Sequence, residues 1–226
     1  MSAEESRLRR EVVATAKALA TRGLTHGKSG NVGVRFGRGF LVTPSGFPYE
    51  EMTPADVVAM TFDGKATGRR EPSSEWRFHA AILAARPEVN AVVHAHSTAA
   101  TALACHRRGI PAFHYMVAVA GGTDVRCAPY ATFGTEGLAA AAVEALRDRR
   151  ACLLANHGQI AVGADLGAAL RLAGEIENLA RQYLDALAIG EPVCLSDAEM
   201  GEVLEKFKTY GVQPRRPSSK SGRRSR

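Results

Sequence analysis

Three histidines lie at the ends of two apolar runs, and their spacing predicts a metal site. The run 91–96 ends in His94-Ala95-His96, and the run 153–158 ends in His157 and a glycine. On a strand, residues two apart share a face with Cα atoms about 6.5–7 Å apart, so one ion can bind both His94 and His96. Neutral imidazoles suit zinc and other late divalent metals. A third ligand from the second run would leave one coordination position open, as catalytic zinc requires.

The alternative for each histidine taken alone is a hydrogen-bonded residue of the core. A pair at the polar end of a strand, with a third histidine in an equivalent position, favours the metal site. Glu75 presents a similar choice, because it follows two serines at the start of a predicted helix. It either interacts with the positive helix end or acts as a general acid and base beside the metal. Spacing alone leaves both open.

Three short clusters of small residues carry the donors that a phosphate group needs. Glycine allows close approach of the backbone, and a helix N-terminus favours an anion. Taken singly, each cluster is also typical of an ordinary turn or cap. The clusters are Ser29-Gly30-Asn31, Ser45-Gly46 and Ser73-Ser74.

The elements that must position these residues alternate between helical and strand-like periodicity. Short strands flanked by helices predict an α/β fold, an α+β sandwich with a central, mostly antiparallel sheet. Ser73 or Ser74 is the expected N-cap of the helix that precedes the histidine pair. Helices are predicted at 5–22, 73–86, 97–107, 134–149, 166–189 and 196–208, strands at 32–35, 40–43, 57–62, 89–96, 151–156 and 160–162, and an extended segment at 111–118.

The distribution of charge argues against a nucleic-acid partner. The chain of 226 residues has a net charge of +6, but residues 212–226 contain six cations and no acid. Residues 1–211, the predicted single domain, are therefore formally neutral. The remaining segment, 212–226, is rich in arginine, serine and proline, which predicts a disordered basic tail.

Other features indicate a cytoplasmic protein with no membrane partner. No run approaches the 18 apolar residues that a membrane span needs. The first residues are acidic and polar, unlike a signal peptide. The four cysteines are widely spaced and form no Cys-x-x-Cys motif, which argues against a disulfide framework.

Longer stretches of the chain resemble the class II aldolase/adducin superfamily, and within it the branch that cleaves L-fuculose 1-phosphate. The resemblance runs in order across residues 8–211, but Asn156 stands where a histidine is frequent. The matching stretches are Gly30-Asn31-Val32, Thr43-Pro44-Ser45-Gly46, 72–79, 91–96, His114-Tyr115-Met116, 127–135, Asn156-His157-Gly158 and 204–211.

The resemblance implies a role for each matching residue. It implies one zinc ion per subunit, or another divalent metal, held by Glu75, His94, His96 and His157. It implies proton transfer by Glu75 and by Tyr115, the latter reaching the site from a neighbouring subunit of a homotetramer. The implied phosphate ligands are Gly30, Asn31, Ser45, Gly46, Ser73 and Ser74, and the implied aldehyde pocket is lined by Phe133 and Tyr210.

The activity implied by the resemblance is reversible retro-aldol cleavage of a small sugar-phosphate substrate. An L-fuculose 1-phosphate-like ketose would give dihydroxyacetone phosphate and an L-lactaldehyde-like product. A 5-deoxyribulose or methylthioribulose 1-phosphate aldolase of a salvage pathway is the main alternative. A sugar-phosphate epimerase, a decarboxylase and a non-catalytic adducin-like scaffold are weaker alternatives, and the scaffold predicts loss of the metal ligands that this chain keeps.

Overall fold

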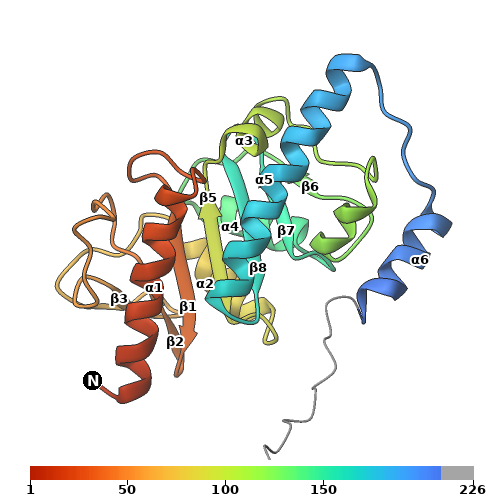
Figure 1. Ribbon diagram of the computed structural model, residues 1–226. Coiled ribbons are helices and arrows are strands. Elements are labelled where there is room, and N and C mark those ends of the chain that lie inside the picture. The colour runs from red at the N-terminus through yellow and green to blue at the C-terminus, as the bar shows by residue number, and fades with distance from the viewer. Residues whose placement is uncertain (210–226) are drawn as a thin grey trace, which may run out of the picture.

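A computed structural model describes residues 1–209 of the chain, and Figure 1 shows how its elements are arranged. Tyr210, the predicted domain boundary at residue 211 and the predicted tail at 212–226 lie outside the described residues.

The described residues form one eight-stranded sheet with strand order β4-β3-β2-β1-β5-β8-β7-β6. All neighbouring strands are antiparallel except β6 and β7, which are parallel. The predicted fold class, with its mostly antiparallel sheet, is therefore confirmed. The strands are β1 (Asn31–Phe36), β2 (Gly39–Val42), β3 (Val58–Thr61), β4 (Ala66–Thr67), β5 (Ala91–Ala95), β6 (Arg126–Ala128), β7 (Ala151–Leu154) and β8 (Gly158–Gly163).

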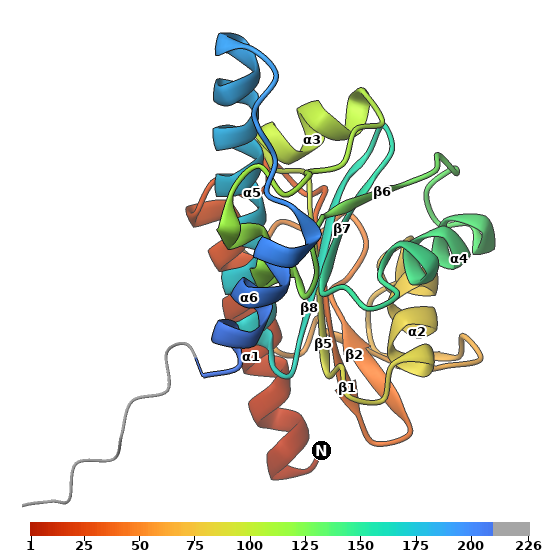
Figure 2. The ribbon, with the colours of Figure 1, turned by 90° about the vertical axis from the view of Figure 1, so that its right-hand side faces the viewer.

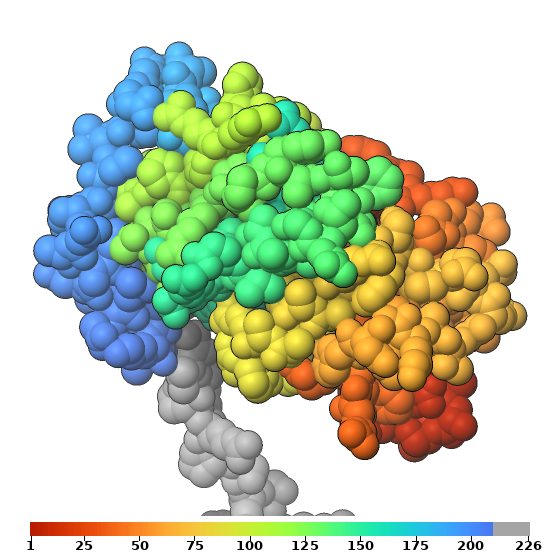
Figure 3. Space-filling view, turned by 180° about the vertical axis from the view of Figure 1, so that it is seen from behind, coloured from red at the N-terminus to blue at the C-terminus, as the bar shows by residue number. Residues whose placement is uncertain are grey.

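Helices cover both faces of the sheet, as the view in Figure 2 shows. The face seen from behind is covered by α2 (Trp76–Ala85) and α4 (Glu136–Ala145), which are yellow and green in Figure 3. On the opposite face lie α1 (Ala3–Thr21), α3 (Thr98–Cys105), the 3-10 helix η1 (Tyr115–Ala120), α5 (Leu166–Ile189) and α6 (Asp197–Phe207).

The two hydrophobic cores follow from the alternation of side chains along the strands. In β5, Ala91, Val93 and Ala95 pack into the core beneath α1 and α5, whereas Val92 packs into the core beneath α2 and α4. His94 belongs to the second face, where its ring contacts Phe78 of α2 at 5.3 Å between centroids. Burial on both faces thus fixes the side of the sheet on which the first predicted ligand lies.

The structure corrects two local predictions. Residues 115–118 of the segment predicted as extended belong instead to the 3-10 helix η1, which His114 caps by accepting a hydrogen bond from the backbone N–H of Met116 at 3.1 Å. Neither Ser73 nor Ser74 is the N-cap of α2, because that position is occupied by Glu75. The Glu75 side chain makes no cap hydrogen bond and is available for other contacts.

A buried carboxylate holds the start of α3, the helix that directly follows the histidine pair. Glu177 of α5 accepts hydrogen bonds from the backbone N–H groups of Ala99 at 2.9 Å and Ala100 at 3.0 Å. These donors belong to the first turn of α3, where backbone N–H groups have no partner within the helix. Glu177 therefore fixes how the chain leaves β5 after His96.

None of the helices in residues 1–209 is both long enough and apolar enough to cross a membrane.

Substitution of Glu177 by alanine is expected to lower the free energy of unfolding by about 2–3 kcal/mol, because two buried donors lose a charged acceptor. Urea denaturation at a fixed protein concentration measures this change. Asp185→Ala, at an exposed position of the same helix, is the matched control, with a change within about 0.5 kcal/mol. Equal losses in the two variants would contradict the role assigned to Glu177.

Candidate metal centre and active site

Three neighbouring strands bring the predicted histidines together. His94 lies on β5, opposite Asn31 of β1 on one side and Ile160 of β8 on the other. His96 follows the end of β5, and His157 lies in the turn between β7 and β8. The three imidazole rings are mutually 4.8 Å apart between centroids.

The turn that carries His157 approaches β5 closely because Gly158 has no side chain. A Cβ atom at Gly158 would lie 2.5 Å from the backbone oxygen of Ala95, which is closer than any normal contact. Asn156, just before the histidine, adopts a left-handed conformation with φ of 55°. The glycine and the tight turn together place His157 beside the histidine pair.

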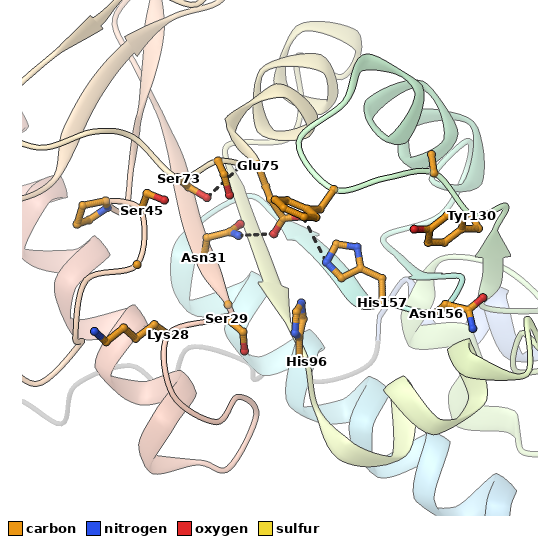
Figure 4. Close-up of a pocket in the computed structure, with 16 residues that line it drawn as sticks. Lys28, Ser29, Asn31, Ser45, Ser73, Glu75, His96, Tyr130, Asn156 and His157 are labelled. Atoms are coloured by element: carbon orange, nitrogen blue, oxygen red, sulfur yellow. Dashed lines mark hydrogen bonds and ion pairs between the residues drawn. The ribbon is translucent and has the colours of Figure 1, made fainter.

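The Nε2 atoms of the histidines face the carboxylate of Glu75. Glu75 Oε2 lies 3.2 Å from His94 Nε2, and Glu75 Oε1 lies 3.3 Å from His157 Nε2. His94 Nε2 and His96 Nε2 are 2.9 Å apart. The ligand atoms of all four residues lie within 4.8 Å of one another, and Figure 4 shows Glu75, His96 and His157 converging in the pocket.

The protonation states of these residues suit metal binding. Burial lowers the pKa of His96 to about 3 and that of His157 to about 4, and repulsion from His94 adds to the effect. Burial alone would raise the pKa of Glu75, but His94, His157 and the Asn31 amide outweigh it and hold this pKa at about 2. At neutral pH His96 and His157 are therefore uncharged and Glu75 is ionised, which are the forms in which these groups bind metals.

Hydrogen bonds also leave the required atoms free. His94 Nδ1 lies 2.9 Å from the backbone oxygen of Gln159, and donation of the Nδ1–H to that oxygen leaves the Nε2 lone pair for a ligand. Glu75 Oε1 is buried and has no hydrogen-bond partner among residues 1–209, although a buried carboxylate oxygen normally has one. One carboxylate and three imidazoles with an unsatisfied oxygen among them form a site able to hold a metal ion.

The candidate metal site lies at a cavity of about 430 Å³. Small polar residues line one end of it, and Tyr130 and Asn156 lie at the other, beyond His157 (Figure 4). Of the predicted residues, the cavity is lined by Gly30, Asn31, Ser45, Gly46, Ser73, Ser74, Glu75, His96, Phe133 and His157. Residues that lie more than 120 positions apart in the sequence therefore line a single cavity in the fold.

Two of the predicted site residues that the structure describes do not line this cavity: His94, which is fully buried, and Tyr115. Tyr115 lies on η1 with 48% of its surface exposed and does not line the cavity. Phe133 does line it, with 64% of its surface exposed. Tyr210 lies outside the described residues.

The cavity also contains residues that the sequence prediction did not assign to the site. Lys28 is the only cationic side chain among the described residues that line it. Lys28 directly precedes the Ser29-Gly30-Asn31 cluster in the sequence, and this position is the signal from which its place in the cavity could have been predicted. Pro44, Tyr130, Ala131 and Asn156 are further lining residues of this kind, and Ser29 belongs to a cluster already singled out for its phosphate donors.

A buried hydrogen-bond network of Asn31 and His79 supports Glu75. Asn31 Nδ2 donates to Glu75 Oε2 at 2.9 Å, and Asn31 Oδ1 lies 2.6 Å from His79 Nε2. His79 lies four residues, or about one helical turn, after Glu75, a spacing that allows either contact with the site or a place on the helix surface. The structure buries it completely.

Comparison with known proteins identifies one family and several aldolases that are similar to this chain. The family described as Class II Aldolase and Adducin N-terminal domain matches residues 10–184. A 5-methylthioribulose-1-phosphate/5-deoxyribulose-1-phosphate aldolase of Rhodospirillum rubrum is 53% identical over 93% of this chain and 96% of its own length. An L-fuculose phosphate aldolase of Escherichia coli K12 is 49% identical over 93% of this chain and 98% of its own.

A solved structure has the same fold. The structure of an L-fuculose 1-phosphate aldolase superposes with a TM-score of 0.87 and 43% identity, covering 92% of this chain and 98% of that one. The family match spans the strands and turns that carry Glu75, His94, His96 and His157. The chain belongs to the class II aldolase and adducin N-terminal domain family.

Proposed function

We propose that this protein is a metal-dependent aldolase that cleaves a ketose 1-phosphate into dihydroxyacetone phosphate and a short aldehyde. The observation that carries the proposal is the convergence of Glu75 with three histidines inside a cavity whose one end is lined by serines and glycines. That arrangement provides for a metal, a phosphate group and a proton carrier in one space. An adducin-like scaffold needs none of these, so the intact set of donors argues against it.

Glu75, His94, His96 and His157 would hold one zinc ion per subunit, since imidazole nitrogens with one carboxylate are typical zinc ligands. Another divalent metal is compatible with the same donors. When bound, the metal supplies Lewis-acid stabilisation of the negative charge that develops on the substrate's oxygens.

The serine and glycine clusters would bind the substrate phosphate. Their hydroxyl and backbone N–H groups are neutral donors, so the charge of a phosphate dianion needs a further partner. Lys28 makes no ion pair with any described residue. We propose that the Lys28 ammonium group attracts the substrate phosphate.

Glu75 is suited to carry a proton because opposing effects act on its pKa. Burial favours the neutral acid, and only the adjacent histidines and Asn31 hold the pKa at about 2. If substrate displaces the carboxylate from the imidazoles, burial raises the pKa toward neutral pH. Glu75 can then deliver a proton to carbon 3 of the dihydroxyacetone phosphate half after the bond between carbons 3 and 4 breaks.

Tyr115 is assigned to a neighbouring subunit's site. Its exposed position on η1 lies away from the cavity of its own chain, so a homotetramer with sites at subunit interfaces accounts for its role. There it would exchange a proton with the hydroxyl on carbon 4, the atom that becomes the aldehyde oxygen. Phe133 and Tyr210 are proposed to contact the aldehyde part, and the cytoplasm is the proposed compartment.

Two substrate classes fit this proposal, and they differ in the aldehyde that is released. L-Fuculose 1-phosphate would release L-lactaldehyde, whereas 5-deoxyribulose and methylthioribulose 1-phosphates would release aldehydes without its hydroxyl. The Rhodospirillum rubrum relative, 53% identical, is named for the second class, so this class is a full alternative. Epimerisation and decarboxylation have no specific observation in their favour.

A coupled assay for dihydroxyacetone phosphate distinguishes these substrates. We expect cleavage of at least one of L-fuculose, 5-deoxyribulose and methylthioribulose 1-phosphates, with the ratio of kcat/KM values identifying the preferred aldehyde. Removal of metal by a chelator should abolish cleavage, and added zinc should restore it. No cleavage of any of the three by zinc-loaded protein would contradict the proposed function.

Replacement of Glu75 by glutamine is expected to lower kcat at least about 100-fold, because the amide cannot transfer the proton. Zinc content, measured by atomic absorption, should stay near one ion per subunit, since three histidines remain. Glu71→Gln, at an exposed position four residues earlier, is the control and should leave kcat unchanged. Turnover by the Glu75 variant close to that of the wild type would remove its catalytic role.

Substitution of Lys28 by methionine is expected to raise KM about two- to fivefold and to leave kcat nearly unchanged. An exposed charge contributes about 1 kcal/mol or less to such an interaction, and the effect should shrink as salt screens it. Inorganic phosphate should likewise become a weaker competitive inhibitor. Lys17→Met, on the exposed side of α1, should change neither value, and equal effects in both variants would argue against contact with phosphate.

A further inference from the structure

His79 is a fully buried histidine that does not belong to the set of metal-ligand candidates. It lies on α2 with no exposed surface, and its ring packs against that of Phe78 at 4.7 Å between centroids. The backbone of β1 accommodates it only because residue 33 is glycine. A Cβ atom at Gly33 would lie 2.5 Å from His79 Nδ1. The fold thus makes room for a buried imidazole beside the strand that carries Asn31.

The hydrogen bonds of His79 and Asn31 determine each other's orientation. Burial lowers the pKa of His79 to about 3, so the ring is neutral and carries one N–H. Its Nδ1 has no hydrogen-bond partner in the part of the chain that the structure describes, whereas its Nε2 lies 2.6 Å from Asn31 Oδ1. A proton on Nδ1 would leave a buried donor unpaired and set two acceptors against each other. The proton therefore belongs on Nε2, from which it is donated to Asn31 Oδ1.

This donation fixes which end of the Asn31 amide faces Glu75. With Oδ1 engaged by His79, Nδ2 points to Glu75 Oε2 and donates to it at 2.9 Å. The flipped amide would set Oδ1 against the ionised carboxylate, which repels it. A neutral histidine donor is therefore the group that keeps an amide donor, rather than an acceptor, directed at the carboxylate.

We propose that His79 is a positioning residue that acts through Asn31 to hold the Glu75 carboxylate at the candidate metal centre. His79 itself touches none of the four candidate ligands through a hydrogen bond in the described residues. Its contribution to turnover rests on the function proposed above. Its contribution to metal affinity does not, because Glu75 is a candidate ligand whatever the substrate.

Metal affinity and kinetics of His79 variants test the proposal. His79→Leu removes the donor, and His79→Gln retains an N–H at a similar distance along the side chain. Substitution of residues that orient metal ligands typically lowers metal affinity or activity 10- to 100-fold. We expect His79→Leu to weaken cobalt binding, measured by competition with a chelator, about tenfold and to lower kcat 10- to 100-fold. KM should change less than about threefold, and His79→Gln should recover most of both losses.

Two controls separate positioning from general destabilisation. Ile82→Val shortens another fully buried side chain of α2 and should lower stability without changing cobalt affinity or kcat. In an Asn31→Ala background, His79→Leu should have little further effect, because the residue through which it acts is gone. An undiminished effect of His79→Leu in that background, or wild-type cobalt affinity in the folded single variant, would overturn the proposal.

A measurement on the unaltered protein covers the case in which His79→Leu fails to fold. Long-range ¹H–¹⁵N spectra of histidine-labelled, zinc-loaded protein report which ring nitrogen carries the proton. The expected state of His79 is the neutral ring with the proton on Nε2. A proton on Nδ1 would overturn the proposal. Wild-type protein that binds cobalt but cleaves none of the sugar phosphates would reject the proposed function and leave the metal-affinity test of His79 in place.

Discussion

The burial of one ionised carboxylate, Glu75, is the constraint on which the site depends. Burial opposes its charge, so the surrounding residues must supply compensation. The imidazoles of His94 and His157 face its two oxygens, and Asn31 donates to one of them. Each of these partners comes from a different strand or turn, so the stable position of the carboxylate requires the β1-β5-β8 register to be correct. Loss of these contacts would raise the pKa of Glu75, which suits the proton-transfer role proposed for it.

The sheet and its helices serve this arrangement through ordinary packing. Alternation along β5 directs His94 to the side of α2, the helix whose N-cap is Glu75 and whose first turns carry His79. Antiparallel pairing sets Asn31 directly opposite His94. Two close approaches, at Gly33 and Gly158, allow the imidazole of His79 and the turn of His157 to come near the strands. The polar centre is thus surrounded by two well-packed apolar cores that hold its residues in place.

Much of the fold was predictable because it rests on periodicity. The helix at 166–189 has the predicted bounds, and the 32–35 and 40–43 strands pair as a hairpin. The predictions that failed involve contacts distant in sequence. Residues 115–120 form a 3-10 helix that packs against the core formed with α5 and α6. Glu75 takes the N-cap position while its carboxylate turns to the histidines, and the serine predicted for that position instead accepts a hydrogen bond from the Glu75 backbone. The two-residue β4 and three-residue β6 are too short to produce a pattern.

The sequence by itself determined the kinds of donor, the two histidine-bearing strand ends and the family resemblance, because these depend on residue type and local spacing. Only the tertiary structure decided which donors face one another. It buried His79 inside the protein rather than on a helix surface, and it directed the Asn31 side chain to Glu75. Lys28 lines the cavity, whereas Tyr115 does not. These outcomes depend on strand register and on the burial of particular faces, which bring together residues as far apart as 31 and 157. No local pattern carries that information.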